Sequence, residues 1–360
     1  RALLERQPAY SILVTTVTPT GSARVSAVFG DNVAHIYAPY DLPGAVSRFL
    51  DRVQPKLAVI METEIWPNLY HGCNRNNVPL LLVNARLSER SERGYSRVRQ
   101  LITQTLSNVT WIAAQSDQDA ERFIRLGAEP GRVTVSGNLK FEQRIPPSLV
   151  ESAEVLRREW GVERPVLIAA STHEGEDALL LDVFEHIRME VRGCLLVLVP
   201  RHPERFGAVA DLCRNRGMNI MLRSQHKPCT PDTSVFIGDS MGELMLFYAA
   251  SDVAFVGGSL VRQGGHNLLE PASLGVPVVC GPHTFNFPEI TQLLVTAGVC
   301  EQVENPARLA VSVSRLLKDA NLRHDIGERG RRVVEKNRGA LQTVLVMIER
   351  QLQNSGSENK

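Results

Sequence analysis

The chain has 360 residues, of which 43% are apolar and 22% are charged, a mixture typical of globular proteins that excludes a disordered or fibrous chain. The formal net charge is +1, so the chain as a whole does not attract nucleic acid, and any anion site must be a local arrangement. No apolar run approaches the roughly 18 to 20 residues that span a bilayer, and the six scattered cysteines without a Cys-x-x-Cys pair indicate reduced thiols rather than a zinc site or a disulfide framework.

Short β-rich apolar runs alternate with helical or turn segments in the first part of the chain. These runs are YSILVTT, VAHIYA, KLAVIME, PLLLVNA, WIAAQS and VTVSGN. The alternation predicts a parallel sheet covered by helices over residues 1–143. Because the first residue is Arg1 and RALLER has the pattern of the end of a helix, we expect this domain to lack its N-terminal part.

A polar, proline-bearing stretch, QRIPPSL, interrupts the pattern after Phe141, and we place the domain boundary there. The alternation resumes with PVLIAAST, CLLVLVPRH, NIMLRS, SVFIGD, VAFVGGS and VPVVCGP, which predicts a second α/β domain over residues 144–335. We expect residues 336–353 to form a terminal helix and residues 354–360 a polar tail. Two such domains in tandem can turn the loops at their strand ends towards a shared cleft.

The most informative segment of the second domain is VAFVGGSLVRQGGHNLLEP. Gly257 and Gly258 would let the backbone approach a ligand closely, and a helix starting near Asn267 would direct its free N–H groups at a phosphate. Glu270, one turn into that helix, could accept hydrogen bonds from ribose hydroxyls. The alternative is that the glycines only form turns and that Glu270 is a surface residue.

Three further strand ends in the second domain carry candidate ligand contacts. GDSMGEL places Ser240, Met241, Gly242 and Glu243 at the head of a helix, where Ser240 and Glu243 could also form a capping box; the two roles are compatible. CLLVLVPRH ends in Pro200, Arg201 and His202, where Arg201 could hold a phosphate or form a structural salt bridge. STHEGED offers the hydroxyls of Ser171 and Thr172, but it is no zinc motif because Asp177 replaces the second histidine.

In the first domain, METEIWPN places Glu62 and Glu64 at a strand end. Strand alternation directs both to the same face, where one could act in catalysis and the other pair with an arginine, or both could be structural. Lys140 in SGNLKF is a further candidate, although a single lysine is usually a surface residue. The segment after PLLLVNA carries arginines that form a solvated helix face or dock a phosphate-bearing lipid near a membrane: Arg86, Arg90, Arg93, Arg97 and Arg99.

Eight segments taken together resemble the bacterial Kdo transferases, which transfer 3-deoxy-D-manno-octulosonic acid (Kdo) onto lipid A precursor. They are METEIWPN, NARLSERS, SGNLKF, STHEGE, VPRHPERF, GDSMGELMLFY, VAFVGGSLVRQGGHNLLEPA and GPHTFNF. The match runs from about Ser11 to about Asn286 and is more specific than the general glycosyltransferase pattern of Gly-Gly followed by Glu-Pro. The resemblance implies the GT-B architecture, in which two Rossmann-like domains face each other across a cleft and the final helix returns to the N-terminal domain.

The resemblance also implies a reaction and its residues. It implies an inverting, metal-independent transfer of Kdo from CMP-Kdo to lipid IVA in lipopolysaccharide biosynthesis, at the cytoplasmic face of the inner membrane. Glu62 and Lys140 match transition-state stabilisers: Lys140 can balance charge on the departing phosphate or the sugar carboxylate, and Glu62 can favour an oxocarbenium-like ring. The residues that match CMP contacts are Pro200, Arg201, Met241, Gly242, Glu243, Asn267, Leu268, Leu269 and Glu270.

One feature of the family pattern is not found in the sequence. The family's general base is a glutamate in a Val-Gly-Glu turn upstream of the helix that we place at RALLER, and this chain contains no such motif. The N-terminal membrane anchor of the family would also lie upstream. We therefore expect the chain to bind the donor but to transfer poorly, since a general base contributes typically about 10² to 10⁴ in rate.

Two other functions fit the same architecture. A nucleotide-sugar epimerase would share the cleft and a ribose-binding glutamate, although the METEIWPN and PRHPERF segments argue against it. A non-catalytic nucleotide-sugar-binding module is the second alternative. No sequence feature indicates nucleic acid as a partner.

Overall fold

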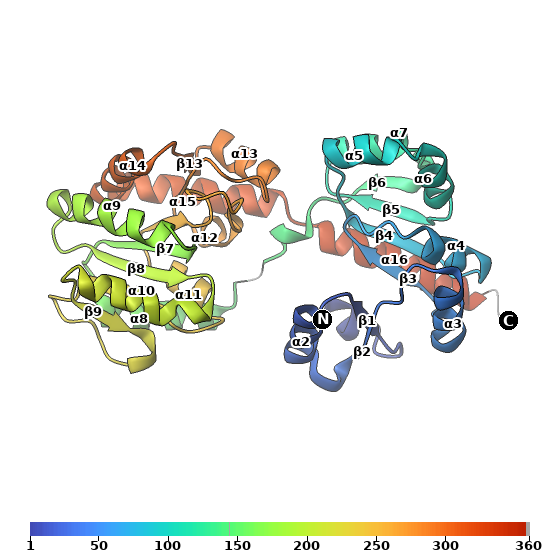
Figure 1. Ribbon diagram of the computed structural model, residues 1–360, viewed down its shortest axis with the longest axis horizontal. Helices are drawn as coiled ribbons and strands as arrows, with labels where there is room; N and C mark the ends of the chain where they lie inside the picture. Colours follow the sequence, from blue (N-terminus) through green and yellow to red (C-terminus); the bar gives the residue numbers. More distant parts are fainter. Residues whose placement is uncertain (144, 358–360) are drawn as a thin grey trace. The chain divides into compact units, whose positions relative to one another are not determined.

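The computed structural model describes residues 1–143 and 145–357, and its helices and strands are labelled in Figure 1. The chain divides into two compact units, one formed by Arg1–Glu142 together with the residues from Arg338 onwards, and the other by Gln143–Asn337. Arg144 of the expected linker and residues 358–360 of the expected tail lie outside the described residues. Residues 354–357, also expected in the tail, continue the helix α16 (Ala340–Ser357).

The unit Gln143–Asn337 is built on a seven-stranded sheet in which every pair of neighbouring strands is parallel. In spatial order the strands are β13 (Cys300–Gln302), β12 (Val278–Cys280), β11 (Val253–Val256), β7 (Val166–Thr172), β8 (Leu195–Pro200), β10 (Val235–Ile237) and β9 (Ile220–Leu222). The chain moves from β7 to β8 on one side and later to β11 on the other. This reversal of direction is the place where open α/β sheets bind ligands.

Both faces of this sheet are buried, because alternate side chains of its central strands pack into two different cores. Leu167 and Ala169 face α9 (Glu176–Glu190), α10 (Phe206–Asn215) and α14 (Pro306–Lys318). Ile168 and Ala170 face α8 (Pro147–Trp160) and α11 (Leu244–Ala249). The helices that complete the unit are α12 (Leu269–Leu274), α13 (Pro288–Thr296) and α15 (Ala320–Lys336). Burial on both faces explains why the strands read as continuous apolar runs.

The N-terminal strands form two sheets, so the expectation of one sheet over residues 1–143 was wrong. The four-stranded sheet follows sequence order: β3 (Ala58–Met61), β4 (Leu80–Ala85), β5 (Trp111–Ala114) and β6 (Val133–Val135). The pair β1 (Leu13–Thr16) and β2 (Ala34–Tyr37) stands apart. None of its residues is buried, so it lacks the apolar face that would hold it in a continuous sheet.

Helices cover both faces of the four-stranded sheet. On one face lie α3 (Pro43–Val53), α4 (Pro67–Arg75), α6 (Arg99–Leu106) and α7 (Asp117–Arg125). On the other, Val344, Ile348 and Leu352 of α16 pack against Leu81 and Val83 of β4 (Figure 1). The remaining helices of this unit are α1 (Ala2–Arg6), α2 (Pro19–Phe29) and α5 (Glu89–Ser96). Within the described part of the chain, no helix combines the length and apolar content needed to cross a membrane.

Candidate functional site

The carboxyl ends of β7, β8 and β11 lie side by side, and two glycines make this approach possible. A Cβ atom on Gly257 would lie 2.6 Å from the carbonyl oxygen of Ser171, so only glycine fits where β11 meets β7. Gly258 has a φ of 68°, in the left-handed region that favours glycine. The glycine pair therefore brings two strand ends together, which is a structural requirement. Both glycines are buried, and their N–H groups donate to the Ala170 carbonyl and to Glu176, each at 2.7 Å, so the structure favours the alternative in which the pair shapes the turn.

Glu176 fixes the loop after β11. Its side chain is fully buried, and its two carboxylate oxygens accept hydrogen bonds from four backbone N–H groups. The donors are His173 at 3.2 Å, Gly258 at 2.7 Å, Ser259 at 3.1 Å and Leu260 at 2.9 Å. Burial raises the pKa of Glu176, and the four N–H donors counteract part of that rise. The glutamate of STHEGED is thus a clamp between β7 and β11, a role that the sequence analysis missed.

Thr172 and Asp177 belong to a second structural contact at the end of β7. The Thr172 hydroxyl donates to the Asp177 carboxylate at 2.6 Å, and Arg205 pairs with the same carboxylate. The prediction that Thr172 is a free hydroxyl for a ligand is therefore wrong. The described residues contain no group of three or more His, Cys, Asp or Glu side chains that could hold a metal ion.

Arg201 is held by its backbone and exposes its side chain. Its N–H donates to the carbonyl of Thr172 at 3.0 Å, which fixes the turn after β8. Its guanidinium is exposed and has no hydrogen bond or ion pair with any of the described residues, so the structural salt bridge considered above is not formed. An arginine at this point of the sheet is available to a phosphate or carboxylate.

Three histidines lie close to one another near this arginine. The Nε2 atoms of His173 and His266 are 2.8 Å apart, and His202 packs edge-on against the His173 ring. The pKa of His266 is lowered to about 4, mainly by burial and further by the neighbouring His173 and Arg201. The pKa of His173 is lowered by burial and by His202. Since both rings are neutral at pH 7, the contact between them needs one proton, which one ring donates to the other. The sequence analysis assigned no role to the pair because its members are 93 residues apart.

Asn267 lies just before the helix α12, and Glu270 lies in its first turn. The helix α12 begins at Leu269, near Asn267 as predicted, and the Asn267 side chain accepts a hydrogen bond from the Leu269 N–H at 3.1 Å. Asn267 also donates to the Glu270 carboxylate at 3.2 Å. Burial raises the pKa of Glu270, whereas Asn267 and Arg201 lower it. Leu268 and Leu269 are buried in the core, so their side chains hold the helix in place.

The segment Ser240–Glu243 precedes its helix and contains no capping box. The helix α11 begins at Leu244, and no side chain caps it. The Glu243 carboxylate pairs with Arg223 at 2.8 Å and accepts a hydrogen bond from the Ser240 hydroxyl, so that Arg223 and Ser240 lower its pKa. Met241 is 63% exposed and Gly242 has a φ of 89°. A ligand at this turn would thus meet the exposed backbone and Met241, while Glu243 is already engaged.

In the N-terminal unit, Glu62 directly follows β3, and Lys140 lies in the 3-10 helix Leu139–Phe141 that follows β6; these are the two outer strands of the four-stranded sheet. The Lys140 Nζ lies 3.7 Å from the Glu62 Oε1, and both side chains remain partly exposed. Glu62 has a φ of 57°, which ends β3 at Met61, so strand alternation does not decide where Glu62 and Glu64 point. The Glu64 carboxylate accepts a hydrogen bond from the Trp66 indole N–H at 2.7 Å, in place of the expected arginine.

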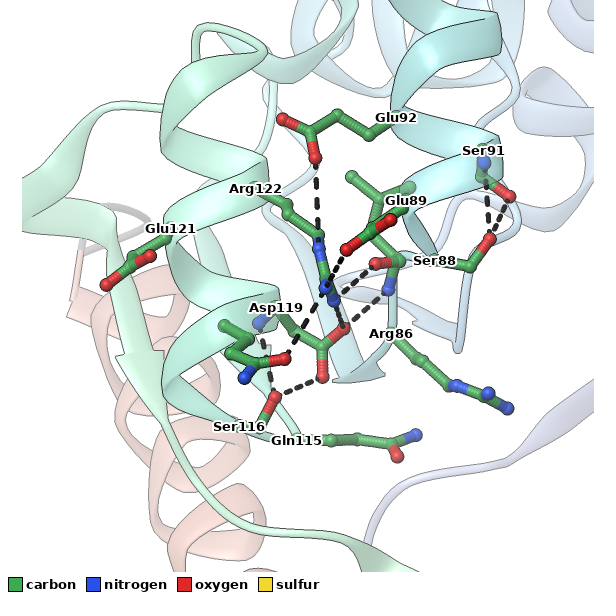
Figure 2. A network of polar contacts seen from close by, with 12 residues as sticks. Arg86, Ser88, Glu89, Ser91, Glu92, Gln115, Ser116, Asp119, Glu121 and Arg122 are labelled. Atoms are coloured by element: carbon green, nitrogen blue, oxygen red, sulfur yellow. Dashed lines mark hydrogen bonds and ion pairs between the residues drawn. The ribbon is translucent and has the colours of Figure 1, made fainter. Parts of the chain in front are cut away.

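The segment after β4 is fixed by a buried acid and an arginine (Figure 2). Asp119 is fully buried and accepts hydrogen bonds from the Leu87 N–H at 2.8 Å and the Ser116 hydroxyl at 2.6 Å. Arg122 donates to the Leu87 carbonyl at 3.1 Å and lies 3.8 Å from Glu92. Arg86 and Gln115 extend away from this network. The network joins α7 to α5 and thereby holds the arginine-bearing segment.

The predicted arginines of this segment differ in their surroundings. Arg90, Arg93 and Arg97 are exposed and have no ion pair or hydrogen bond with the part of the chain that the structure describes, whereas Arg86 is partly buried. Arg99 donates to the Arg125 carbonyl at 3.2 Å. The nearby Val98 and Leu101 are 51% and 49% exposed. The junction of α5 and α6 therefore presents positive charge together with apolar side chains.

A cavity of about 510 Å³ lies elsewhere in the unit Gln143–Asn337, between α8 and the segment that precedes β11. Its lining includes Arg157, whose guanidinium is committed to Asp252 at 2.9 Å and to the carbonyl of Ala250 at 3.0 Å. The cavity adjoins the amino ends of the strands. Because the exposed Arg201, the glycine pair and the histidine cluster lie at the carboxyl ends, we place the candidate site there.

Comparison with known proteins decides the family. Residues 1–143 match the family model described as 3-deoxy-D-manno-octulosonic-acid transferase (kdotransferase), and residues 218–333 match glycosyl transferases group 1. A 3-deoxy-D-manno-octulosonic acid transferase of Haemophilus influenzae is 44% identical over 99% of this chain and 83% of that protein. The chain belongs to the Kdo transferase family. The resemblance of the eight sequence segments is thereby confirmed.

Solved structures relate this Kdo transferase family member to two proteins. The C-terminal CMP-Kdo binding domain of WaaA from Acinetobacter baumannii is 33% identical, with a TM-score of 0.50 over 52% of this chain and 98% of that domain. UDP-GlcNAc 2-epimerase from Neisseria meningitidis is 14% identical, with a TM-score of 0.62 over 94% of this chain and 91% of that one. At that identity the epimerase shows the fold alone, and the fold is the predicted GT-B architecture with an N-terminal and a C-terminal Rossmann-like domain.

Proposed function

We propose that this protein is an inverting glycosyltransferase that moves Kdo from CMP-Kdo to lipid IVA in lipopolysaccharide biosynthesis, at the cytoplasmic face of the bacterial inner membrane. The acceptor is bound by the N-terminal domain, residues 1–143, and the donor by the C-terminal domain, residues 144–335. The exposed guanidinium of Arg201, without an ion pair among the described residues, carries the donor half of this proposal. Family membership and the CMP-Kdo binding domain of the Acinetobacter relative support it.

The donor site gathers Arg201 with the backbone and side chains that follow three strands. The CMP phosphate binds the Arg201 guanidinium, and the ribose hydroxyls donate to Glu270, whose position is fixed by Asn267. Pro200, Met241, Gly242, Glu243, Leu268 and Leu269 complete the proposed contact set. In this set Glu243 acts by ordering the turn through Arg223, and Leu268 and Leu269 act by anchoring α12 in the core.

Binding of CMP tests this assignment directly. A ligand at 100 times its Kd stabilises the native state by about 2.7 kcal/mol, so saturating CMP should raise the melting temperature of the protein. Arg201→Ala should lose most of this shift, whereas Arg192→Ala, which removes an exposed arginine that precedes β8 and so lies at the opposite end of this strand from Arg201, should keep it. An unchanged CMP shift in Arg201→Ala would remove Arg201 from the donor site.

Transfer itself needs stabilisation of a departing phosphate and an electron-poor sugar. The acceptor hydroxyl oxygen bonds to the anomeric carbon from the face opposite the phosphate, the bond to the phosphate oxygen breaks with its electron pair leaving on CMP, and the hydroxyl proton passes to a base. Lys140 stabilises negative charge on the phosphate or on the sugar carboxylate, and Glu62 stabilises the oxocarbenium-like ring. Their separation of 3.7 Å supports a shared site.

A transfer assay separates this reaction from its alternatives. With CMP-Kdo and lipid IVA, mass spectrometry should detect lipid IVA that carries Kdo. A chelator should leave the rate of transfer unchanged, because the proposed reaction is metal-independent. The epimerase alternative predicts that UDP-GlcNAc, supplied as a second substrate, is epimerised and that no lipid is modified. The binding-module alternative predicts a CMP-induced melting shift with neither product. Lys140→Ala should reduce transfer on the order of 10²-fold or more while CMP binding persists.

We further propose that the α5–α6 junction contacts the membrane surface. Arg90, Arg93 and Arg97 are exposed beside the apolar side chains of Val98 and Leu101, a combination suited to anionic headgroups. Each arginine near an anionic surface contributes about 1 kcal/mol of attraction. The lipid acceptor would then be met at the surface that carries it.

Vesicle sedimentation tests this contact. The protein should sediment with phosphatidylglycerol vesicles at low salt, less so at high salt, and not with phosphatidylcholine vesicles. Replacement of Arg90, Arg93 and Arg97 by glutamine should release it. Replacement of three exposed arginines of the other unit, Arg158, Arg192 and Arg332, changes the net charge equally and should leave binding intact. Equal losses from the two triple variants would show that only net charge matters.

A further inference from the structure

Three residues with amide side chains, two of them buried and Asn138 half-buried, connect the strand ends between Glu62 and Lys140. The four strands follow the order β3, β4, β5, β6, so that Glu62 follows one edge strand and Lys140 follows the other. Asn84 is the penultimate residue of β4, Gln115 follows β5, and Asn138 follows β6. Asn84 and Gln115 are only 3% and 7% exposed. Asn84 and Gln115 thus occupy the ends of the two interior strands, which separate the two proposed transition-state stabilisers.

Hydrogen bonds join the Asn138 amide to the Gln115 amide, and the Gln115 amide to the backbone of Asn84. The Gln115 Nε2 donates to the Asn84 carbonyl at 2.8 Å, and the Asn138 Nδ2 donates to the Gln115 Oε1 at 2.8 Å. Both functional atoms of the buried Gln115 side chain therefore have partners, which fixes the orientation of its amide. Figure 2 shows Gln115 extending from the end of β5 away from the Arg122 network, so the two networks are separate.

The chain ends on the backbone that carries Lys140. The Asn84 Oδ1 accepts from the Leu139 N–H at 2.9 Å, and the Asn138 Oδ1 accepts from the Lys140 N–H at 2.9 Å. These bonds fix the short 3-10 helix Leu139–Phe141, whose Phe141 is buried. The Cα of Lys140, from which the ammonium reaches Glu62, is therefore held from both β4 and the turn after β6.

The backbone at Asn84 shows why an amide stands there. Asn84 has a φ of 52°, and the pairing of β4 with β5 shifts register between Leu82 and Ala85. Asparagine adopts the left-handed conformation more readily than other residues with a Cβ atom, and bulges of this kind redirect side chains next to active sites. The irregularity directs the Asn84 side chain to the Leu139 N–H, which a regular strand would not do.

We propose that Asn84, Gln115 and Asn138 are positioning residues, a relay of amide side chains and the Asn84 backbone that sets the reach of Lys140 towards Glu62 and through it the rate of sugar transfer. The proposal rests on the function proposed above for Lys140. A displacement of a catalytic group by about 1 Å can cost on the order of 10²-fold in rate. We therefore expect Gln115→Met, which keeps the length of the side chain but removes both hydrogen bonds, to lower kcat by about 10- to 100-fold.

The experiment is a double-mutant cycle with Lys140→Ala. Gln115→Met should lower kcat with CMP binding unchanged, and adding it to Lys140→Ala should change the rate less than about twofold, because the relay acts through that lysine. Gln118→Met is the matched control at an exposed position of α7 and should be active. Asn138→Ser cuts the bond to Gln115 yet keeps an oxygen that can cap Lys140, so it should fold and show a smaller loss.

The outcomes separate the relay from the function on which it rests. If Lys140→Ala lowers transfer while Gln115→Met and Asn138→Ser do not, the relay is refuted and the role of Lys140 stands. If Gln115→Met lowers transfer equally with and without Lys140, the amides act through another group and the proposal is overturned. If Lys140→Ala leaves transfer unchanged, both the proposed role of Lys140 and the relay fail. If Gln115→Met does not fold, Asn138→Ser in the same cycle decides.

Discussion

Replacement of Glu176 by glutamine should destabilise the unit Gln143–Asn337 without adding or removing a heavy atom. The Oε1 of Glu176 accepts from the N–H groups of Ser259 and Leu260, and the Oε2 accepts from those of His173 and Gly258. A glutamine presents one oxygen and one NH₂ group. Whichever way the amide turns, two backbone N–H groups face a donor and lose their acceptor.

The cost follows from the two lost acceptors. A buried donor left without a partner costs about 1–3 kcal/mol, so two cost about 2–6 kcal/mol. Burial raises the pKa of the native glutamate, which shows that its ionised form is itself stabilised only in part, and we therefore expect the middle of this range. With a urea m-value of up to about 3 kcal/mol per M, the unfolding midpoint should fall by about 1 to 2 M.

Urea unfolding can be followed in this unit alone, because the chain has three tryptophans and Trp160 is the one within Gln143–Asn337. Trp160 packs against Phe236 with ring centroids 5.1 Å apart, so its fluorescence reports this core. A background with Trp66→Phe and Trp111→Phe removes the other two signals. Glu174→Gln makes the same chemical change at an exposed position two residues away and serves as the control.

Equal unfolding midpoints for Glu176→Gln and Glu174→Gln would refute this reasoning, because the four hydrogen bonds would then contribute no net stability. A lowered midpoint with unchanged CMP affinity would show that the clamp stabilises the unit without shaping the donor site. We expect both properties to change, since the clamped Gly258 lies next to the His266 ring, beside the proposed site.

Three further outcomes follow from buried groups. The pKa of His266 is about 4 in the native protein and about 6.5 in the unfolded chain, so the unfolded chain binds more protons between these two pH values. The free energy of unfolding should therefore fall by about 1–2 kcal/mol as the pH drops from 6.5 to 4, a magnitude that allows for the partial exposure of the ring. The urea midpoint should vary less over this pH range in His266→Asn than in the unchanged protein. Ile348→Ala in α16 should cost about 2–5 kcal/mol in the N-terminal unit by calorimetry, whereas the exposed Val311→Ala should cost little. Asp119→Asn should lower the free energy of unfolding of the N-terminal unit by about 1–3 kcal/mol, because it weakens the contacts of Asp119 with Leu87, Ser116 and Arg122. Asp117→Asn, at an exposed position, should leave this stability unchanged. Equal melting temperatures of the two variants would contradict the prediction.

The sequence predicted most strands correctly because their side chains are buried on both sheet faces. PVLIAAST and CLLVLVPRH contain β7 and β8, whose residues are all buried. It missed β13, whose three residues include Glu301 and Gln302 at the sheet edge and carry no apolar run. It also gave no sign that β1 and β2 pair apart from β3, because strand pairing depends on non-local contacts that a run of residues does not encode.

Site residues were predictable where local chemistry is distinctive and hidden where partners are distant in sequence. Arg201 was identified because an arginine after a buried strand is conspicuous. The pairing of His173 with His266 and the chain from Asn84 to Asn138 were missed, since these residues look ordinary until the strand ends are assembled. The HEGE and NARL segments contained the signal, as a glutamate four residues after β7 and an asparagine near the end of β4, but their buried backbone partners could not be named.

By itself the sequence determined the parallel α/β class, the family through eight ordered segments, and the loops that carry the chemistry, because apolar periodicity and strand-end residues are local properties. Only the tertiary structure decided which of those residues are free to meet a ligand and which are committed to the fold. Thr172, Glu176 and Glu243 satisfy internal partners, whereas Arg201 does not. The reason is that a buried polar group must find its partner wherever the fold supplies one, and that partner is often far away in the chain.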